Sequence, residues 1–281
     1  MQVIINADDF GLNDSVNAAI VECYRFGTIS STSLMVNTGG FQNAVSEMAS
    51  TPGLGVGLHF NLTSGIAISG SQHIIQSRMS ILRSLVTGLI SQAQIQDELH
   101  AQLCAFGETG RAPTHIDTHQ HIHLIPAIFE VLSRYCMQHQ VPLRIPWVPV
   151  LGVPGTMRKR VKGFLSTRLI KHNLRKAQGD IICNHGLVSI FDISRTPALA
   201  ALADYELMLD SISVDGTEVM VHPKLPGFDE LEGTSISAIS ENEFGIMTSD
   251  AFRAALTNRH IELISYADLA NKGLSKKTGN T

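Results

Sequence analysis

The chain lacks the features that mark several classes of protein. Its four cysteines are widely separated and form no C-x-x-C pair, which argues against a cysteine-held metal or a redox motif. The net charge is −4 and no basic stripe is present, so neither a nucleic-acid surface nor electrostatic docking to anionic lipid is expected. No apolar run approaches the roughly 20 residues of a membrane span. The expected partner is therefore a small or neutral molecule.

Two further expectations come from the first residues and from the cysteines. Asp8 interrupts the only early hydrophobic run and no basic segment precedes it, so we expect no secretory signal and a cytoplasmic protein. Free cysteine is among the most buried residue types. We therefore expect buried, unreactive thiols at Cys23, Cys104, Cys136 and Cys183.

Linkers and nucleotide-binding loops are also missing. The 281 residues, 44% of them hydrophobic, are enough for one large core, and no Pro/Ser/Gly-rich stretch marks a boundary. We expect one domain over residues 1–275 and a polar tail over 276–281, with two smaller domains as the alternative. No G-x-G-x-x-G follows the first strand and no G-x-x-x-x-G-K occurs, so the usual loops for nucleotide phosphates are absent.

What the chain does contain is an alternation of β-rich and helical segments. Strands are expected within 2–7, 31–37, 54–60, 114–119, 141–146, 180–186, 217–223 and 261–267. Helices are expected near 14–26, 41–50, 92–106, 126–138, 158–176, 196–211 and 249–258. About seven strand-helix units imply parallel strands with right-handed crossovers. Without a phosphate loop, a distorted (β/α) barrel is favoured over a doubly wound α/β sheet.

Polar residues end several of these apolar segments. Asp8 and Asp9 end the first strand, His59 ends the third, the run 117–123 ends a middle one, and His222 ends a late one. In a parallel barrel the carboxyl ends of the strands meet at one mouth, where working residues lie. Packing does not explain four such ends, so the sequence predicts a site at this mouth.

The two adjacent carboxylates raise a geometric question, because neighbours in a regular strand face opposite ways. Both Asp8 and Asp9 can serve one site only if the backbone turns, which Gly11 permits. Helix capping is the alternative role, but Asn13 or Asp14 can already cap the following helix. The pair therefore indicates one metal ligand and one proton acceptor.

The segment "PTHIDTHQHIHLIP", residues 113–126, holds a cluster of histidines. In a helix His119 and His123 would share a face. In extended backbone Asp117 would share a face with four histidines: His115, His119, His121 and His123. Pro126 suits the first turn of the next helix, so a strand end and loop is favoured. A surface histidine cluster is the alternative.

One carboxylate and two imidazoles would make a three-ligand site with open positions for water, as in hydrolytic metal centres. A structural zinc site would be closed by a fourth ligand, typically cysteine, and no cysteine is near these motifs. This donor set suits zinc, cobalt or nickel. Taken alone, His59 is more typical of a hydrogen-bonded structural histidine than of a ligand.

Three other residues are candidates for the same site. Asp117 could orient a ligand histidine. His222 could donate a proton to a leaving group, or be a surface histidine in a turn. Arg144 could hold Asp8 or a substrate oxygen, or pair at the barrel rim.

Four motifs in order, "NADDFGLN", "GLGVGLHFNLT", "PTHIDTHQHIHLIP" and "EVMVHP", resemble the YdjC-like carbohydrate deacetylases. These include chitooligosaccharide deacetylases and hopanoid-associated relatives, and "NHGLVSIFD" looks closer to the latter. The resemblance implies a distorted barrel of the glycoside hydrolase/deacetylase type, which removes acetyl groups from N-acetylated sugars with one divalent metal ion, often Mg²⁺. It implies Asp9, His59 and His119 as metal ligands, Asp8 as the catalytic base and His222 as the acid.

Two other functions stay open at this point. Asp/His sites on barrels also hydrolyse phosphoesters, commonly with two metal ions. A non-catalytic sugar-binding protein is the other alternative, although binding alone would need neither Asp8 nor His222. An exposed apolar patch is expected at 145–155, as a substrate wall or as a subunit contact in a homodimer.

Overall fold

The strands form one curved sheet. The structure is a computed structural model, which describes residues 1–147, 157–177, 179–193, 199–227 and 237–271. The order along the sheet is β4 (Ile116–Thr118), β3 (Gly55–Phe60), β2 (Ser31–Leu34), β1 (Gln2–Phe10), β6 (Thr217–Val221) and β5 (Gly186–Ser189), and β7 (Glu262–Leu263) pairs with the start of β1. Every strand pair of the described residues is parallel. The predicted α/β class is confirmed.

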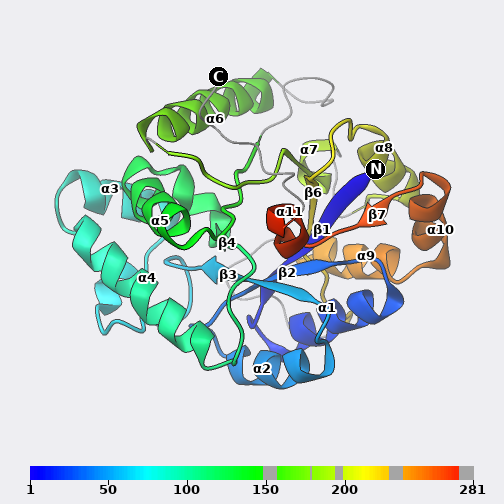
Figure 1. Cartoon of the computed structure of the whole chain (residues 1–281), viewed down its shortest axis with the longest axis horizontal. Coiled ribbons are helices and arrows are strands. Elements are labelled where there is room, and N and C mark those ends of the chain that lie inside the picture. Colours follow the sequence, from blue (N-terminus) through cyan, green and yellow to red (C-terminus); the bar gives the residue numbers. More distant parts are fainter. Residues whose placement is uncertain (148–156, 178, 194–198, 228–236, 272–281) are drawn as a thin grey trace.

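Helices surround this sheet (Figure 1). The longer ones are α1 (Asp14–Phe26), α2 (Phe41–Ser50), α3 (Arg78–Val86), α4 (Gln92–Gly107), α5 (Pro126–His139), α6 (Met157–Lys176), α8 (Leu202–Asp210), α9 (Ser237–Met247) and α10 (Asp250–Asn258). The short ones are α7 (Ile190–Ile193), α11 (Tyr266–Asn271) and the 3-10 helices η1 (Gln72–Ile74) and η2 (His119–Leu124). The predicted α1 and α2 are confirmed at both ends, and α3, α7, α9 and α11 were not predicted.

The ends of α1 show why its limits could be read from the sequence. The Asn13 side chain accepts a hydrogen bond from the backbone N–H of Val16 and so caps the first turn. Gly27 ends the helix with φ +85°, a left-handed conformation that glycine adopts at little cost. Helix capping therefore does not use Asp8 or Asp9.

The sheet curves as a half-barrel, and irregular segments span its open side. Leu143 forms an isolated parallel bridge with Ile116 of β4, and its backbone N–H donates to Ile182 O at 2.9 Å. The chain then runs from Ile182 into β5, which pairs with β6. The predicted distorted barrel is therefore confirmed, with its most distorted part opposite β1 and β2.

The strands predicted at 141–146 and 180–186 are wrong, because a side-chain amide replaces part of the backbone ladder there. Ile145 N–H donates to Asn184 Oδ1 at 2.7 Å, and Asn184 Nδ2 donates to Ile145 O at 3.0 Å. Such an exchange satisfies the buried polar groups without a regular strand. β5 begins only at Gly186.

Helix α11 lies at the centre of the ring of elements in Figure 1 and fills the amino-terminal end of the barrel. Its Tyr266 is fully buried and stacks on the ring of His115 with centroids 4.0 Å apart. A Cβ at Gly57 would lie 2.3 Å from the His115 ring, so glycine makes room for this stack. With this end filled, the polar strand ends lie at the opposite end.

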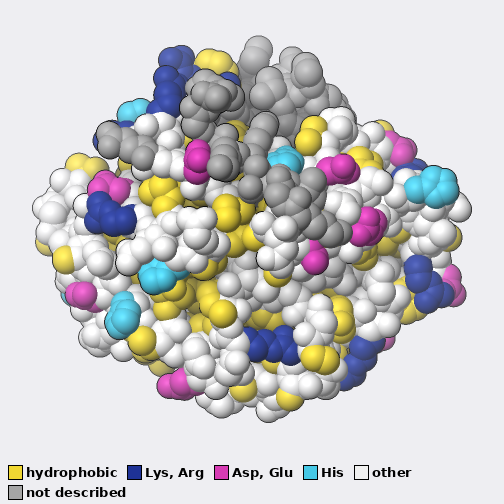
Figure 2. Space-filling model, in the orientation of Figure 1, with side chains coloured by type: hydrophobic (Ala, Val, Ile, Leu, Met, Phe, Trp, Pro, Cys, Tyr) yellow, Lys and Arg dark blue, Asp and Glu magenta, His cyan; other side chains and the backbone are white. Residues whose placement is uncertain are grey.

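The surface bears on several expectations. On the face shown in Figure 2 the charged side chains are scattered rather than gathered into a patch of one sign. Within the described ranges, no helix is both long and apolar enough to cross a membrane. Three of the cysteines are buried as predicted, whereas Cys104 is exposed because it lies on the outer face of α4.

Some predictions fall outside the described residues or are corrected by them. The tail 276–281 and residues 148–155 of the expected apolar patch lie outside the described ranges. In the remainder of that patch Ile145 and Pro146 are buried, so the prediction of an exposed surface is wrong there. The helix expected near 196–211 begins as α8 at Leu202.

Candidate active site

The end of β1 is irregular, and this irregularity turns two adjacent carboxylates inward. The pairing of β1 with β2 shifts register between Ala7 and Phe10. Asp9 has φ +69°, a left-handed conformation that is uncommon for a residue other than glycine. Asp8 and Asp9 are both buried. Gly11, with φ +90°, lets the chain leave sharply as predicted, but the turn that reorients the pair is at Asp9 itself.

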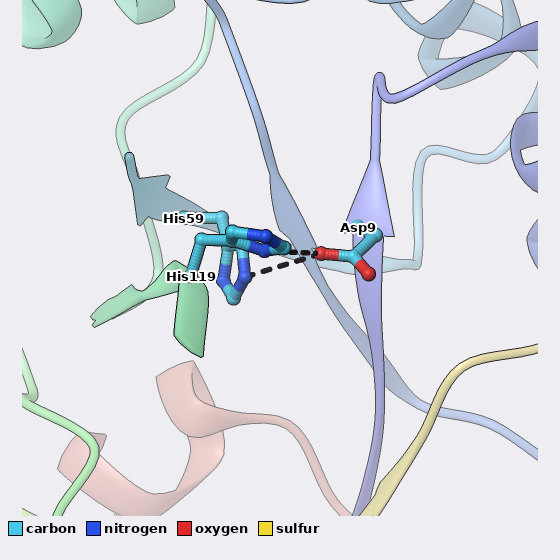
Figure 3. A group of neighbouring side chains, drawn as sticks. All are labelled: Asp9, His59 and His119. Carbon is cyan, nitrogen blue, oxygen red and sulfur yellow. Dashed lines mark hydrogen bonds and ion pairs between the residues drawn. The ribbon is translucent and has the colours of Figure 1, made fainter. Parts of the chain in front are cut away.

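Asp9, His59 and His119 point toward one another from β1, β3 and the start of η2 (Figure 3). Asp9 Oδ1 lies 3.0 Å from His119 Nδ1 and 3.3 Å from His59 Nε2. Donor atoms of the three residues all lie within 4.8 Å of one another, and all three residues are buried. A carboxylate and two imidazoles converging in this way fit one divalent ion with open coordination positions.

Asp117 fixes the orientation of one of these imidazoles. His59 Nδ1 lies 2.7 Å from Asp117 Oδ1, which leaves Nε2 to face Asp9. The Ser33 hydroxyl donates to Asp117 Oδ2 at 2.7 Å and holds the carboxylate in turn. Carboxylates commonly orient a ligand histidine through its other nitrogen in this way.

When no metal ion is bound, the contacts of His59 with Asp117 and Asp9 favour a proton on the His59 ring. Burial lowers the pKa of His59, but the charge and hydrogen bond of Asp117 outweigh burial and raise it to about 10. Burial raises the pKa of Asp9, but the neighbouring His119 and His59 hold it well below its usual range. A metal ion would therefore have to displace a proton from this cluster.

Arg144 is a buried counter-ion rather than a rim residue. It is fully buried, and its Nη2 and Nη1 donate to Asp8 Oδ1 and Oδ2 at 2.6 and 2.7 Å. Nη1 also lies 2.5 Å from Asp117 Oδ2, and Nε donates to Glu218 Oε2 at 3.0 Å. The planar guanidinium suits such paired contacts.

These contacts keep Asp8 ionised. Burial raises the pKa of Asp8, but the charge and hydrogen bonds of Arg144 outweigh burial and lower it. Asp8 Oδ1 accepts from Asn6 Nδ2 as well as from Arg144, whereas Oδ2 accepts only from Arg144 among the described residues. Since each carboxylate oxygen can accept about two hydrogen bonds, Oδ2 retains a free lone pair.

His222 follows β6 directly and faces that oxygen. Its Nε2 lies 4.0 Å from Asp8 Oδ2, and its side chain is 15% exposed. Its backbone N–H donates to Glu243 Oε2 at 2.6 Å. Asp8 and His222 thus form a carboxylate-imidazole pair beside the Asp9 cluster.

The other histidines of 113–126 do not extend the cluster. Extended backbone ends at Thr118, and Gln120 and His121 have φ +56° and +52° within η2, so the face that fully extended backbone would give these histidines does not form. His123 is fully buried and pairs with the Thr118 hydroxyl, and burial lowers its pKa to about 3. The predicted loop is a short 3-10 helix that presents His119 alone to Asp9.

Sequence reasoning missed several polar residues that support the site. Asn6 and Ser33 lie in β1 and β2, and Glu218 in β6 is fully buried between Arg144 and Tyr266. Burial raises the pKa of Glu218 to about 7 although Arg144 opposes the rise. A charged residue inside the apolar run "TEVMV" was a usable signal for it. Glu243 lies in an unpredicted helix and carried no such signal.

Comparison with known proteins identifies the family of this chain. A family model described as "YdjC-like protein" matches residues 2–258. The carbohydrate deacetylase of Brevibacillus brevis is 32% identical over 272 residues, which cover 96% of this chain and 100% of the relative. The chitooligosaccharide deacetylase of Proteus mirabilis is 32% identical over 279 residues, which cover 95% and 98%.

A solved structure from Enterococcus faecalis V583, described as a candidate cellobiose-phosphate cleavage protein, has the same fold. Its TM-score is 0.73 with 22% identity, over 98% of this chain and 99% of that one. At this identity the likeness concerns the fold alone. The family match extends from β1 into α10 and includes every strand end described above. The chain belongs to the YdjC-like protein family.

Proposed function

We propose that the protein is a metal-dependent carbohydrate deacetylase that removes acetyl groups from N-acetylated sugars. The observation that carries the proposal is the Asp8–His222 pair lying directly beside the Asp9, His59 and His119 donor set. The names of the relatives from Brevibacillus brevis and Proteus mirabilis support the substrate class. In this proposal Asp9, His59 and His119 hold one divalent ion.

A bound divalent ion would polarise the acetamide carbonyl and stabilise negative charge on its oxygen. Asp8 accepts the proton of the attacking water at Oδ2, the oxygen with a free lone pair. Arg144 keeps Asp8 ionised and fixed in orientation. His222 donates a proton from Nε2 to the sugar nitrogen as the C–N bond breaks. General acid-base help of this kind contributes about 10²–10⁴-fold to a rate.

The two-metal phosphoesterase alternative has a specific obstacle. A second set of donors, from Asp8, His59 and Asp117, also lies close enough to hold an ion. The Arg144 guanidinium, however, already pairs with Asp8 and Asp117. A cation there would have to displace a buried arginine, so we expect one ion for each chain. A non-catalytic sugar-binding protein would need neither Asp8 nor His222.

The test is acetate release from a panel of N-acetylated mono- and oligosaccharides by protein stripped of metal and reloaded with Mg²⁺, Zn²⁺ or Co²⁺. We expect release only after reloading, with a metal-to-protein ratio near one at full activity. The ion that restores the highest rate identifies the metal, Mg²⁺ being expected from the family. No release with any ion, or a ratio near two, would contradict the proposal.

A further inference from the structure

Glu243, on α9, lies on the opposite side of His222 from Asp8. It is fully buried, and its Oε2 accepts the backbone N–H of His222 at 2.6 Å. The same oxygen lies 3.8 Å from His222 Nδ1. The other oxygen, Oε1, accepts a hydrogen bond from the Tyr205 hydroxyl at 3.2 Å. The ring of His222 therefore lies between two buried carboxylates, with Nε2 toward Asp8 and Nδ1 toward Glu243.

The surroundings of Nδ1 point to the same partner. His222 Nδ1 is buried and has no hydrogen-bond partner among the described residues. Phe191 approaches the ring edge-on, with centroids 5.8 Å apart, and limits its rotation. Glu243 Oε2 is thus the acceptor toward which Nδ1–H can turn, and a buried nitrogen without such an acceptor would be costly.

A buried carboxylate also needs compensation, and His222 is the group that can supply it. Among the described residues, His222 is the basic group within ion-pair distance of Glu243, with Nδ1 3.8 Å from Oε2. Burial raises the pKa of Glu243, and the charge of His222 opposes that rise most strongly. A positively charged imidazole is also the form of His222 that an acid step requires.

We propose that Glu243 is the positioning residue of His222: it keeps the proton on Nδ1 and presents Nε2 to the leaving nitrogen. This inference rests on the proposed deacetylation. Glu243 acts through His222 and does not touch the substrate. Tyr205 orients Glu243 through its other oxygen and has a smaller effect in the same direction.

The test compares Glu243→Gln with wild type on two substrates, N,N′-diacetylchitobiose and 4-nitrophenyl acetate. Amide cleavage needs a proton on the departing amine, whereas nitrophenolate leaves without one. For the amide, Glu243→Gln should lower kcat by about 10–100-fold, a part of what general acid catalysis supplies, and leave KM within about threefold. For the ester, kcat should stay within about threefold. Equal losses on both substrates, or none, would overturn the proposal.

Two further variants separate positioning from folding. Glu241→Gln makes the same change on the same helix, where the carboxylate pairs with Lys224 at 3.2 Å, and should leave both rates unchanged. Tyr205→Phe removes only the hydroxyl that holds Glu243 and should lower the amide rate by about threefold to tenfold. If Glu243→Gln does not fold, an amide-selective loss in Tyr205→Phe supports the proposal and its absence refutes it.

An independent readout is the ¹⁵N spectrum of the His222 ring, assigned by loss of its signals in His222→Gln. With the ring neutral, wild type should carry the proton on Nδ1, and Glu243→Gln or Tyr205→Phe should shift it toward Nε2. The same tautomer in all proteins would refute positioning by Glu243. If wild type hydrolyses neither substrate, the proposed function fails, and the tautomer comparison still decides the role of Glu243.

Discussion

Replacement of Arg144 by methionine should test whether one guanidinium compensates several buried carboxylates. Methionine keeps an unbranched side chain but removes the charge that Asp8, Asp117 and Glu218 share. Removing one partner of a buried ion pair typically costs about 3–5 kcal/mol, because the other charge remains uncompensated. We expect at least that loss, a large share of the roughly 5–15 kcal/mol that stabilises a typical domain. At about 2–4 °C for each kcal/mol, the melting temperature of the metal-free protein should fall by roughly 6–20 °C.

The loss should also depend on pH with a defined sign. Burial raises the pKa values of Asp8 and Asp117, but the charge of Arg144 outweighs burial and lowers both below 3.8. The two ionised carboxylates therefore stabilise the folded wild type above about pH 4. This stabilisation is lost as the pH falls through the lowered pKa values. In Arg144→Met, Glu218 loses the charge that opposes the effect of its burial, so its pKa rises above the value of about 7 that it has in wild type. That variant therefore loses stability as the pH rises. The difference from wild type should be larger at pH 8 than at pH 5.

Urea unfolding of metal-free proteins at both pH values measures this difference. Arg111→Met is a matched control, because Arg111 donates to the backbone carbonyls of Met48, Leu54 and Thr51. Its loss of stability should be similar at pH 5 and pH 8. A loss below about 1 kcal/mol in Arg144→Met, or one that does not change with pH, would refute the counter-ion role of Arg144.

Other expected outcomes follow from the same contacts. Asp8→Asn should lower kcat by about 10²–10⁴-fold and still bind the metal ion. His119→Ala should lose both the activity and the metal ion. Metal analysis of each variant, carried out beside the rate assay, distinguishes the two outcomes. Because the pKa of Glu218 is raised to about 7, wild type should lose stability as the pH rises from 4.5 to about 7, and Glu218→Gln should reduce that slope in urea unfolding. The pKa of metal-free His59 is raised to about 10, so a metal ion must displace its proton at pH 7. Metal affinity measured by calorimetry should therefore rise by up to about tenfold for each pH unit from 7 to 9. An affinity that does not change with pH would contradict the assignment of His59 as a metal ligand.

The sequence predicted the parts of the fold that depend on local signals. Helix α1 could be read from its apolar period, from Asn13 at its start and from Gly27 at its end. The segments 141–146 and 180–186 have strand composition but are not strands. Their irregularity depends on a contact between Asn184 and Ile145, 39 residues apart in the chain, which no local pattern reveals.

The candidate site was predictable to a similar extent. Polar residues at strand ends gave the positions of Asp9, His59 and His222, because parallel strand ends must meet. The sequence did not reveal that η2 would turn His123 away from His119, since this depends on the left-handed backbone at Gln120 and His121. Glu243 was missed because a charged residue in a helix is ordinary unless its burial is known.

The question posed by two adjacent carboxylates is answered by their distant partners. Arg144, 136 residues away, compensates Asp8, while His119, 110 residues away, approaches Asp9. The guanidinium carries a permanent charge, so Asp8 remains an ionised acceptor that has no need of a metal ion. Deprotonated imidazoles beside Asp9 would present lone pairs to an ion, whereas an ion at Asp8 would have to displace Arg144. The two neighbours therefore differ in what they can bind, and this difference is the reason that the proposed function predicts a single ion.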